Sequence, residues 1–247
     1  MTKSRLAVLG LTSLLLTATA CAAGTDATTV PVGPKLSKVL FAGDSIAVGE
    51  ALPLSAAFKA GGVDFQSIAA EGGGNVVGPA AEENWPAISA QITSAKADVV
   101  IYQLTTYDWG TEQEQRTGYQ NLLDVTTRAG SKLVLVTAPP IRPDDFYLPH
   151  MADLDRTPAV ARAVAQTAPD NATFLDASSA WGTTYQQTRD GKADRSADGI
   201  HTCPQGAARF TNWLLGELAK RPGGFTPADP GSWANTGWSA DRHFQGC

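Results

Sequence analysis

The sequence predicts a three-layer α/β/α domain around a five-stranded, mainly parallel sheet. Two observations support this fold class: five short apolar and β-branched runs, and segments of helical character that alternate with them along the chain. Such alternation is typical of doubly wound sheets, because each helix returns the chain to the same edge and covers one face. The 247 residues suffice for one domain of this kind with a full core.

The predicted strands are near-continuous apolar runs, which favours burial on both faces, as in a parallel sheet. The second partly alternates between apolar and polar residues, and the fifth is the weakest. They occupy residues 38–42, 63–68, 98–104, 132–137 and 173–176.

Helix-compatible segments lie between and after these runs. In the last one apolar residues recur at helical spacing, Thr202 or Cys203 can cap it, and Pro204 suits its first turn. The predicted helices are residues 46–60, 80–94, 112–129, 156–168 and 204–220. In such sheets the reactive groups gather at the carboxyl ends of the strands, so a site is expected in the segments that follow the strands.

The N-terminus is expected to be a signal peptide. Two basic residues precede an apolar stretch, residues 6–16, which has signal-peptide length and is too short to span a bilayer. Small residues then precede Cys21, as in a bacterial lipobox, although Leu is usual where Ala18 stands. We expect an exported lipoprotein, lipidated at Cys21 and anchored on the outer face of the bacterial membrane. Plain secretion is the alternative.

Four segments follow from these patterns. Residues 1–20 form the signal peptide, and residues 21–36, which are small, polar and proline-containing, form a lipid-anchored tether. Residues 37–221 form the main domain, and residues 222–247, rich in Gly, Pro and Trp, form a coil packed on it. The net charge of −5 and the lack of a basic run argue against nucleic-acid binding. We expect a monomer that meets the membrane only through its anchor.

The chain has three cysteines, an awkward number for an exported protein. If Cys21 is lipidated, Cys203 and Cys247 remain and can form a disulfide outside the cytoplasm. That bond would hold the C-terminal tail beside the segment that carries His201. The alternative is two separate thiols, with Cys203 buried.

The strongest chemical signal is Gly43-Asp44-Ser45 at the end of the first predicted strand. A serine on a strand-to-helix turn exposes its hydroxyl at the carboxyl edge of the sheet. Its own N–H, at the start of the next helix, can face a developing oxyanion. The motif alone is also ordinary turn chemistry, so its position after a strand is what makes it informative.

The second signal is Asp198-Gly199-Ile200-His201, just before the last predicted helix. A serine nucleophile needs a base, and the base needs a carboxylate that orients it. The Asp-x-x-His spacing lets one loop deliver both groups. His150 and His243 have no such Asp and helix combination, so Ser45, Asp198 and His201 are the predicted catalytic triad; a purely structural His201 is the alternative.

Together, Gly43-Asp44-Ser45 near the mature N-terminus and Asp198-x-x-His201 near the C-terminus resemble the SGNH (GDSL) hydrolase superfamily. The order Ser, Asp, His and the α/β alternation also match, and the pattern spans about residues 38–220. The resemblance implies a serine esterase that uses no cofactor. The Gly-x-Ser-x-Gly elbow is absent around Ser45, which disfavours the α/β-hydrolase fold.

The resemblance also implies a glycine after the second strand, whose backbone N–H completes the oxyanion hole with that of Ser45. Glu71-Gly72-Gly73-Gly74-Asn75 follows that strand. Gly72 is the first choice and Gly73 is nearly as good. The alternative is a flexible glycine turn.

The family's third block, Gly-x-Asn-Asp, is altered. Alignment on Asp108 puts Thr105 at the Gly position and Tyr107 at the Asn position, the last oxyanion donor. The hole then has only two backbone donors, or Gln103, Thr106 or the Tyr107 hydroxyl replaces the third, or turnover is poor, because one lost donor costs about 100- to 1,000-fold in rate. A similar loss is seen in SGNH domains that work with membrane acyltransferases on cell-surface sugars.

Asp144, Asp145 and His150 lie in a polar loop, and their spacing matches no metal motif, so no metal is expected. The preferred function is an esterase that hydrolyses short-chain, O-acetyl esters on cell-envelope glycans or glycolipids. One alternative is an acyltransferase that moves the acyl group to or from a sugar hydroxyl. Another is a catalytically weak glycan-binding lipoprotein.

Overall fold

The computed structural model describes residues 1–2, 35–221 and 225–247. Cys21, nearly all of the predicted signal peptide and nearly all of the predicted tether lie outside the described residues. None of the helices in the described ranges is both long and apolar enough to cross a membrane.

The core of the domain is a five-stranded parallel sheet, as predicted. The spatial order is β2-β1-β3-β4-β5, so the chain starts near the centre, adds one strand on one side, and then builds outward on the other. Neighbouring strands are paired in parallel throughout. The strands are β1 (Lys38–Ala42), β2 (Asp64–Ser67), β3 (Val99–Gln103), β4 (Lys132–Val136) and β5 (Ala172–Leu175).

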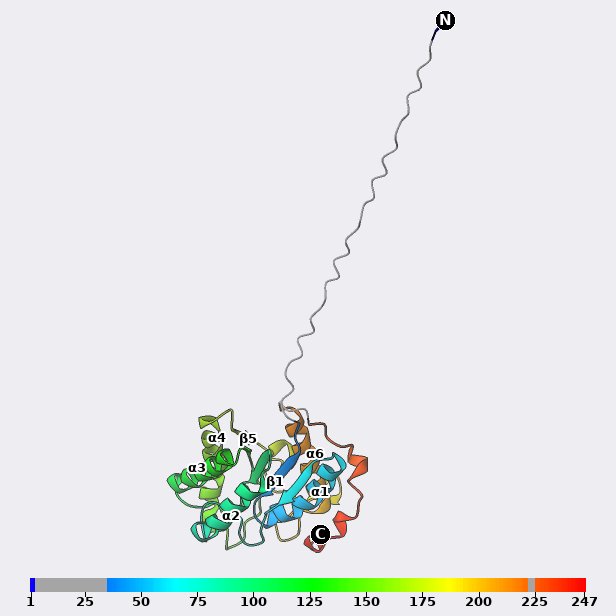
Figure 1. Ribbon diagram of the computed structural model, residues 1–247. Helices are drawn as coiled ribbons and strands as arrows, with labels where there is room; N and C mark the ends of the chain where they lie inside the picture. The colour runs from blue at the N-terminus through cyan, green and yellow to red at the C-terminus, as the bar shows by residue number, and fades with distance from the viewer. Residues whose placement is uncertain (3–34, 222–224) are drawn as a thin grey trace. The chain divides into compact units, whose positions relative to one another are not determined.

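Helices cover both faces of the sheet. The contacts of α1 with α6 form one outer layer, and those of α2 with α3 and of α3 with α4 form the other, as Figure 1 shows. The long helices are α1 (Ser45–Ala60), α2 (Ala81–Ala95), α3 (Glu112–Arg128), α4 (Met151–Thr167) and α6 (Pro204–Ala219). This is the predicted three-layer α/β/α fold.

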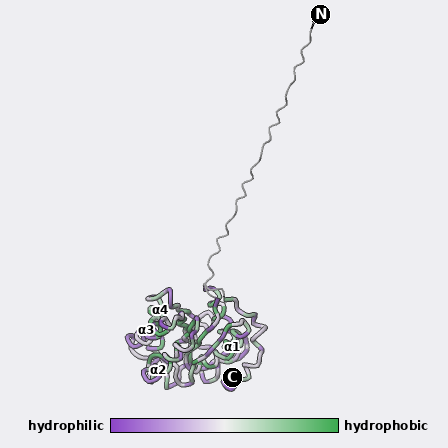
Figure 2. Tube along the Cα trace, in the orientation of Figure 1, coloured by the Kyte–Doolittle hydropathy of each residue, from purple (hydrophilic) through white to green (hydrophobic). Residues whose placement is uncertain are grey.

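Side-chain alternation along the strands divides the core in two. Leu40, Val100 and Leu133 pack with residues of α2, α3 and α4, whereas Phe41 and Ile101 pack with residues of α1 and α6. Because both faces are buried there, β1, β3 and β4 are apolar along most of their length. The edge strand β2 is mostly polar and exposed. Figure 2 accordingly shows hydrophobic segments in the interior and hydrophilic ones along the outer helices.

Several short elements were not predicted. Helix α4 begins at Met151, five residues before the expected start, because a short turn, η1, runs directly into it. The segment before the predicted triad loop holds a small antiparallel hairpin. The short elements are η1 (Leu148–His150), α5 (Ser178–Trp181), β6 (Thr188–Arg189), β7 (Lys192–Ala193), η2 (Pro230–Ser232), η3 (Trp238–Ala240) and η4 (Arg242–Phe244).

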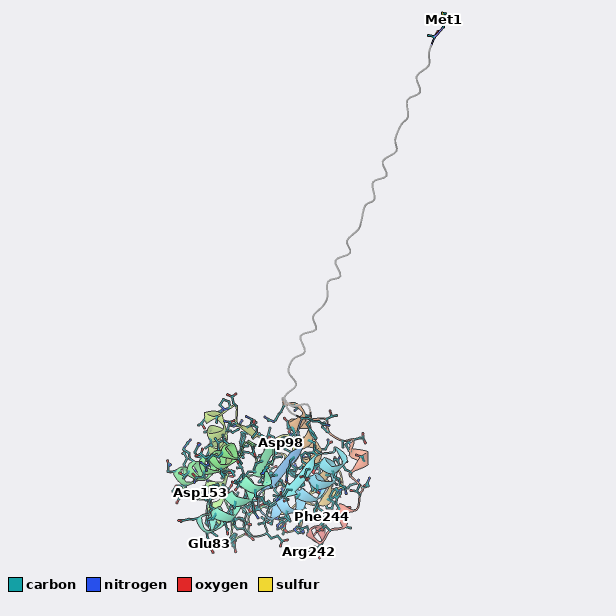
Figure 3. All side chains as sticks on the ribbon, viewed as in Figure 1. Met1, Glu83, Asp98, Asp153, Arg242 and Phe244 are labelled. Carbon is teal, nitrogen blue, oxygen red and sulfur yellow. A yellow bond between two sulfur atoms is a disulfide. The ribbon has the colours of Figure 1, made fainter. Side chains whose placement is uncertain are left out.

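The described part of the C-terminal segment, residues 225–247, packs along α1. Phe225 and Trp233 are buried in the core between α1 and α6, and Phe244 is buried as well. In Figure 3 Arg242 and Phe244 lie toward the opposite end of the sheet from Asp98, which immediately precedes β3. The tail therefore ends at the carboxyl edge of the strands, where the predicted site lies.

Candidate active site

Ser45 is the first residue of α1 and lies directly after the turn that ends β1. Asp44 caps the helix, and its Oδ1 accepts a hydrogen bond of 3.0 Å from the backbone N–H of Ile46. Its Oδ2 accepts two more, from the N–H (2.7 Å) and the hydroxyl (2.8 Å) of Thr106. Burial raises the pKa of Asp44, although these hydrogen bonds oppose the shift. The carboxyl group thus joins the Ser45 turn to the loop after β3.

The three predicted triad residues lie in hydrogen-bond contact. His201 Nε2 is 2.8 Å from Ser45 Oγ, and His201 Nδ1 is 2.7 Å from Asp198 Oδ2. With Nδ1 donating to the carboxylate, Nε2 is left able to accept the serine proton. Ser45 and His201 are 156 residues apart in sequence and come together because both segments reach the carboxyl edge of the sheet.

The Asp198–His201 segment is a compact turn held by its own carboxylate. Asp198 Oδ1 accepts hydrogen bonds from the N–H of Ile200 (2.7 Å) and of His201 (3.0 Å). Partial burial alone would raise the pKa of Asp198, but the hydrogen bonds from the His201 ring and these two N–H groups outweigh it and lower the pKa. Asp198 therefore stays ionised over the pH range in which an imidazole titrates.

Arg195 holds this turn in place, a contact that no sequence pattern predicted. Its guanidinium is buried and donates to the carbonyl oxygens of Pro140, Ile200 and His201. Burial lowers the pKa of Arg195, and the charge of Glu50 partly offsets the shift. Arg195 thus ties the His201 backbone to the loop after β4.

Gly72 and Ser45 line the same cavity, which we call the Ser45 pocket. It has a volume of about 520 Å³ and is lined by Ser45, Glu71, Gly72, Tyr107, His201, Arg242, His243 and Gln245. Gly73, the second candidate of the glycine-rich segment, is not among the lining residues. Gly74 fixes the path of this loop: it has φ +79, and a Cβ there would lie 2.0 Å from the carbonyl oxygen of Gly43. The loop therefore passes directly over the Ser45 turn.

The three candidates to replace the missing Asn differ in position. Gln103 is fully buried, and its amide donates to Glu50 Oε2 at 2.6 Å, so proposing it as an oxyanion donor was wrong. Thr106 was also wrong, because both its N–H and its hydroxyl donate to Asp44. Tyr107 alone reaches the Ser45 pocket. The identity of a third donor stays a prediction that concerns Tyr107.

Asp108 anchors the loop that presents Tyr107. Its buried carboxyl group accepts hydrogen bonds from the hydroxyls of Tyr102 (2.8 Å) and Tyr119 (3.0 Å) and from the N–H of Thr105 (3.1 Å). Burial raises the pKa of Asp108 to about 6, although these hydrogen bonds oppose the shift. Within the altered block, the buried Asp108 is therefore structural, and Tyr107 lines the pocket.

The C-terminal tail supplies Arg242, His243 and Gln245 to the Ser45 pocket. The predicted disulfide between Cys203 and Cys247 is present and closes a separation of 44 residues. His243 lies 2.9 Å from Glu71 Oε1 and 3.2 Å from Asp241 Oδ1, so it links the tail to the glycine-rich loop. The disulfide prediction placed the tail near His201, but no sequence pattern identified these three residues.

Aromatic side chains gather beside the pocket. The Tyr107 ring lies 5.5 Å from Trp109 and 6.3 Å from Phe146 and from Tyr147, measured between centroids. Phe146 is 53% exposed, which makes the cluster part of the surface. Among the described residues, no group of three or more His, Cys, Asp or Glu could hold a metal ion.

Comparisons with known proteins give structural matches. No protein-family model matches this chain, and no curated protein matches its sequence. An acetylxylan esterase from Geobacillus stearothermophilus matches with TM-score 0.52 and 15% identity, over 78% of this chain and 98% of that one. A carbohydrate esterase family 3 protein from Talaromyces cellulolyticus matches with TM-score 0.54 and 19% identity, over 75% and 97%.

A salicylyl-acyltransferase from a tetracycline biosynthetic pathway also matches, with TM-score 0.53 and 18% identity, over 76% of this chain and 55% of that one. At these identities the likeness concerns the fold. The chain shares the α/β/α fold of these two esterases and of the acyltransferase.

Proposed function

We propose that this protein is a serine esterase with Ser45 as nucleophile, His201 as general base and Asp198 as the carboxylate that orients the imidazole. The observation that carries the proposal is the unbroken chain of contacts from Asp198 Oδ2 through His201 to Ser45 Oγ, at 2.7 and 2.8 Å. These distances are those that proton transfer from the serine requires.

In the proposed reaction, Ser45 Oγ attacks the ester carbonyl while His201 Nε2 takes the hydroxyl proton. The carbonyl oxygen becomes an oxyanion, which the backbone N–H groups of Ser45 and Gly72 stabilise. When the intermediate collapses, the bond to the alcohol breaks and His201 returns the proton to the leaving oxygen. Water then attacks the acyl-serine with the same base, which releases the acid and restores Ser45. Asp198 stays ionised throughout and stabilises the imidazolium.

We propose short O-acyl groups, foremost acetyl, on cell-envelope glycans or glycolipids as the substrate. Two structural matches are described as an acetylxylan esterase and a carbohydrate esterase, which supports esters of sugars. Export is supported by the disulfide, because such bonds persist outside the cytoplasm. Lipidation of Cys21 and anchoring on the outer face of the membrane belong to the same proposal.

The test is hydrolysis of nitrophenyl acetate, butyrate and octanoate by the purified protein and by its Ser45→Ala variant. The proposal predicts activity that is highest on acetate and is lost in the variant. Undiminished hydrolysis by Ser45→Ala would contradict the assignment of the nucleophile. Equal activity on all three esters would contradict the preference for short acyl groups.

An acyltransferase is the second candidate, because the fold is shared with the salicylyl-acyltransferase. The same acyl-serine would then be captured by a sugar hydroxyl instead of water. Adding sugar acceptors during turnover separates the two: acylated acceptor at the expense of free acid identifies a transferase. An absence of both products, with an intact fold, would favour the catalytically weak binding protein.

A further inference from the structure

A second cavity, of about 610 Å³, lies between α2 and α3 at the end of the sheet that carries the Ser45 pocket. We call it the α2–α3 groove. Nothing in the proposed catalytic steps uses it. The residues on which the argument depends are Val76, Val77 and Gly78 of the floor, and Glu82, Trp85, Trp109, Gln113 and Asn121 of the walls.

The walls combine flat aromatic surface with hydrogen-bonding groups. Trp85 and Trp109 are half-buried, and Gln113, Asn121 and Glu82 are exposed. An indole packs well against the C–H face of a sugar ring, and amide and carboxylate groups can bind the hydroxyls at its edge. Such a mixture of apolar platforms and a few polar groups is typical of small-ligand sites.

The acidic charge of the groove disfavours the binding of anionic polymers. Among the described residues that line it, none is Lys, Arg or His, whereas Glu82 and Glu114 are acidic. A phosphate- or carboxylate-rich chain would meet like charges there. A neutral chain of sugars meets no such repulsion.

The groove lies beside the Ser45 pocket, and Tyr107 and Trp109 connect their linings. Tyr107 lines the pocket and Trp109 lines the groove, and the two rings are 5.5 Å apart. Trp109 is held in place by His150, which stacks on it at 3.9 Å. Tyr107 and Trp109 also touch the groove floor, since a Cβ at Gly78 would lie 2.1 Å from the carbonyl oxygen of Tyr107 and 3.0 Å from that of Trp109.

The floor is preformed. The buried Asn75 side chain donates to the carbonyl oxygens of Val77 (2.6 Å) and Pro79 (2.9 Å), and the N–H of Val76 donates to the Tyr102 hydroxyl. A site whose backbone is already fixed binds without the entropic cost of ordering it.

We propose that the α2–α3 groove binds the sugar units adjacent to the acylated one, so that the substrate is a neutral oligosaccharide or polysaccharide. The inference rests on the proposed esterase function for its role in catalysis. Binding itself needs no turnover. Trp85 is the platform, and Gln113 and Asn121 bind the hydroxyls.

The test is calorimetric titration of the Ser45→Ala protein with unesterified xylotetraose, cellotetraose and chitotetraose. We expect at least one tetrasaccharide to bind, and Trp85→Ala in the same background to weaken that binding by about tenfold or more, a change of about 1.4 kcal/mol. Trp213→Ala is the matched control, because Trp213 is half-buried against the other half of the core and lines neither cavity.

Asn121→Ala is a second groove variant that should not affect folding, because Asn121 is exposed and its truncation leaves the core intact. We expect it to weaken binding by about threefold, within the range for one lost hydrogen bond. Binding that is equal in Trp85→Ala and Trp213→Ala, or no binding of any of the three tetrasaccharides, would overturn the inference.

Activity measurements then separate this inference from the proposed function. With Ser45 intact, Trp85→Ala should lower kcat/KM on an acetylated xylo-oligosaccharide about tenfold more than on nitrophenyl acetate. Equal losses on both esters would overturn the groove while leaving the esterase in place. Undiminished hydrolysis by Ser45→Ala would overturn the esterase while leaving the titration result standing.

Discussion

The residues of the Ser45 pocket are held in two different ways. His201 is fixed within one turn, because Asp198 binds both its ring and its backbone and Arg195 holds its carbonyl. The lining residues other than Ser45 and His201 come from three distant segments, which we call the rim: Glu71 and Gly72, then Tyr107, and in the tail Arg242, His243 and Gln245. The rim is held by a buried carboxylate, a disulfide and the His243 contacts.

This difference separates chemistry from substrate fit. The triad turn carries the groups that move protons, so damage there should lower kcat with little effect on the fold. Apart from the Gly72 N–H, a proposed oxyanion donor, and Tyr107, the candidate third donor, the rim carries no group that acts in the proposed mechanism. Damage to its tail segment should therefore change stability and KM. Each prediction below targets one of the two arrangements.

The largest effect is expected from the triad turn. His201→Ala removes the base, and Asp198→Asn leaves the geometry while removing the charge that favours the correct tautomer. We expect each to lower kcat on nitrophenyl acetate by about 10,000-fold. The midpoint of urea unfolding should stay close to that of the unaltered protein. A loss below tenfold in His201→Ala would contradict the role of His201.

The Cys203–Cys247 disulfide is the covalent bond that holds the tail segment of the rim. Cys247→Ser should reduce the free energy of unfolding by up to about 4 kcal/mol, the loop-closure effect for a 44-residue separation. It should also raise KM more than it lowers kcat, because only the tail loses its anchor. Urea unfolding and steady-state kinetics measure the two effects.

Reduction of the unaltered protein should reproduce the phenotype of Cys247→Ser, and the variant itself should be insensitive to reductant. A fall in kcat that matches the triad variants would contradict the separation of rim and triad.

Asp108, which holds the Tyr107 loop, should make stability depend on pH. Its pKa in the folded protein is about 6, above the ordinary 3.8, so the folded state binds this proton more tightly than the unfolded state. Its contribution is therefore complete below about pH 4 and is lost as the pH rises through 6, by up to about 3 kcal/mol. Asp108→Asn should lack this loss.

Urea unfolding at pH 4.5 and 7.5 tests this. Asp44 and Glu50, whose pKa values burial also raises, are present in both proteins, so the difference between them isolates Asp108. The same pH dependence in both proteins would show that Asp108 does not titrate in this range.

The smallest effect is expected from the contacts of His243 with Glu71 and Asp241. The His243 side chain is mostly buried, but both partner carboxylates are solvent-accessible. Because solvent screens such pairs, each contributes at most about 1 kcal/mol, so His243→Ala should raise KM by no more than about fivefold and leave kcat near its original value. Gln245→Ala, in the same pocket but outside these contacts, is the matched control. A loss of kcat in His243→Ala comparable with that in His201→Ala would assign proton transfer to the tail.

The two arrangements also differ in how far the sequence predicted them. Ser45 and the Asp198–His201 turn are each encoded by a short spacing, and the strand positions place both at one edge of the sheet. β1 was predicted at its observed bounds, and β2, β3, β4 and β5 to within one residue at either end. The buried strands β1, β3 and β4 were predicted from apolar runs, and the exposed edge strand β2 from a partial alternation.

The rim was largely missed, because no local spacing encodes it. Arg242, His243 and Gln245 lie in a coil without periodicity, and only the predicted pairing of Cys203 with Cys247 indicated where the tail ends. Gln103 and Thr106 were chosen by proximity to the altered block, but sequence does not show which polar groups buried carboxylates such as Glu50 and Asp44 engage. The early start of α4 was hidden by the polar residues around η1.

The most direct test of the central claim is covalent labelling with a fluorophosphonate, followed by mass spectrometry of the peptides. The account predicts one adduct on Ser45, no labelling in Ser45→Ala, and much slower labelling in His201→Ala, because the base that activates the serine is gone. Failure to label Ser45 in the folded protein, or equal labelling in His201→Ala, would contradict the assignment of Ser45, His201 and Asp198 as a catalytic triad.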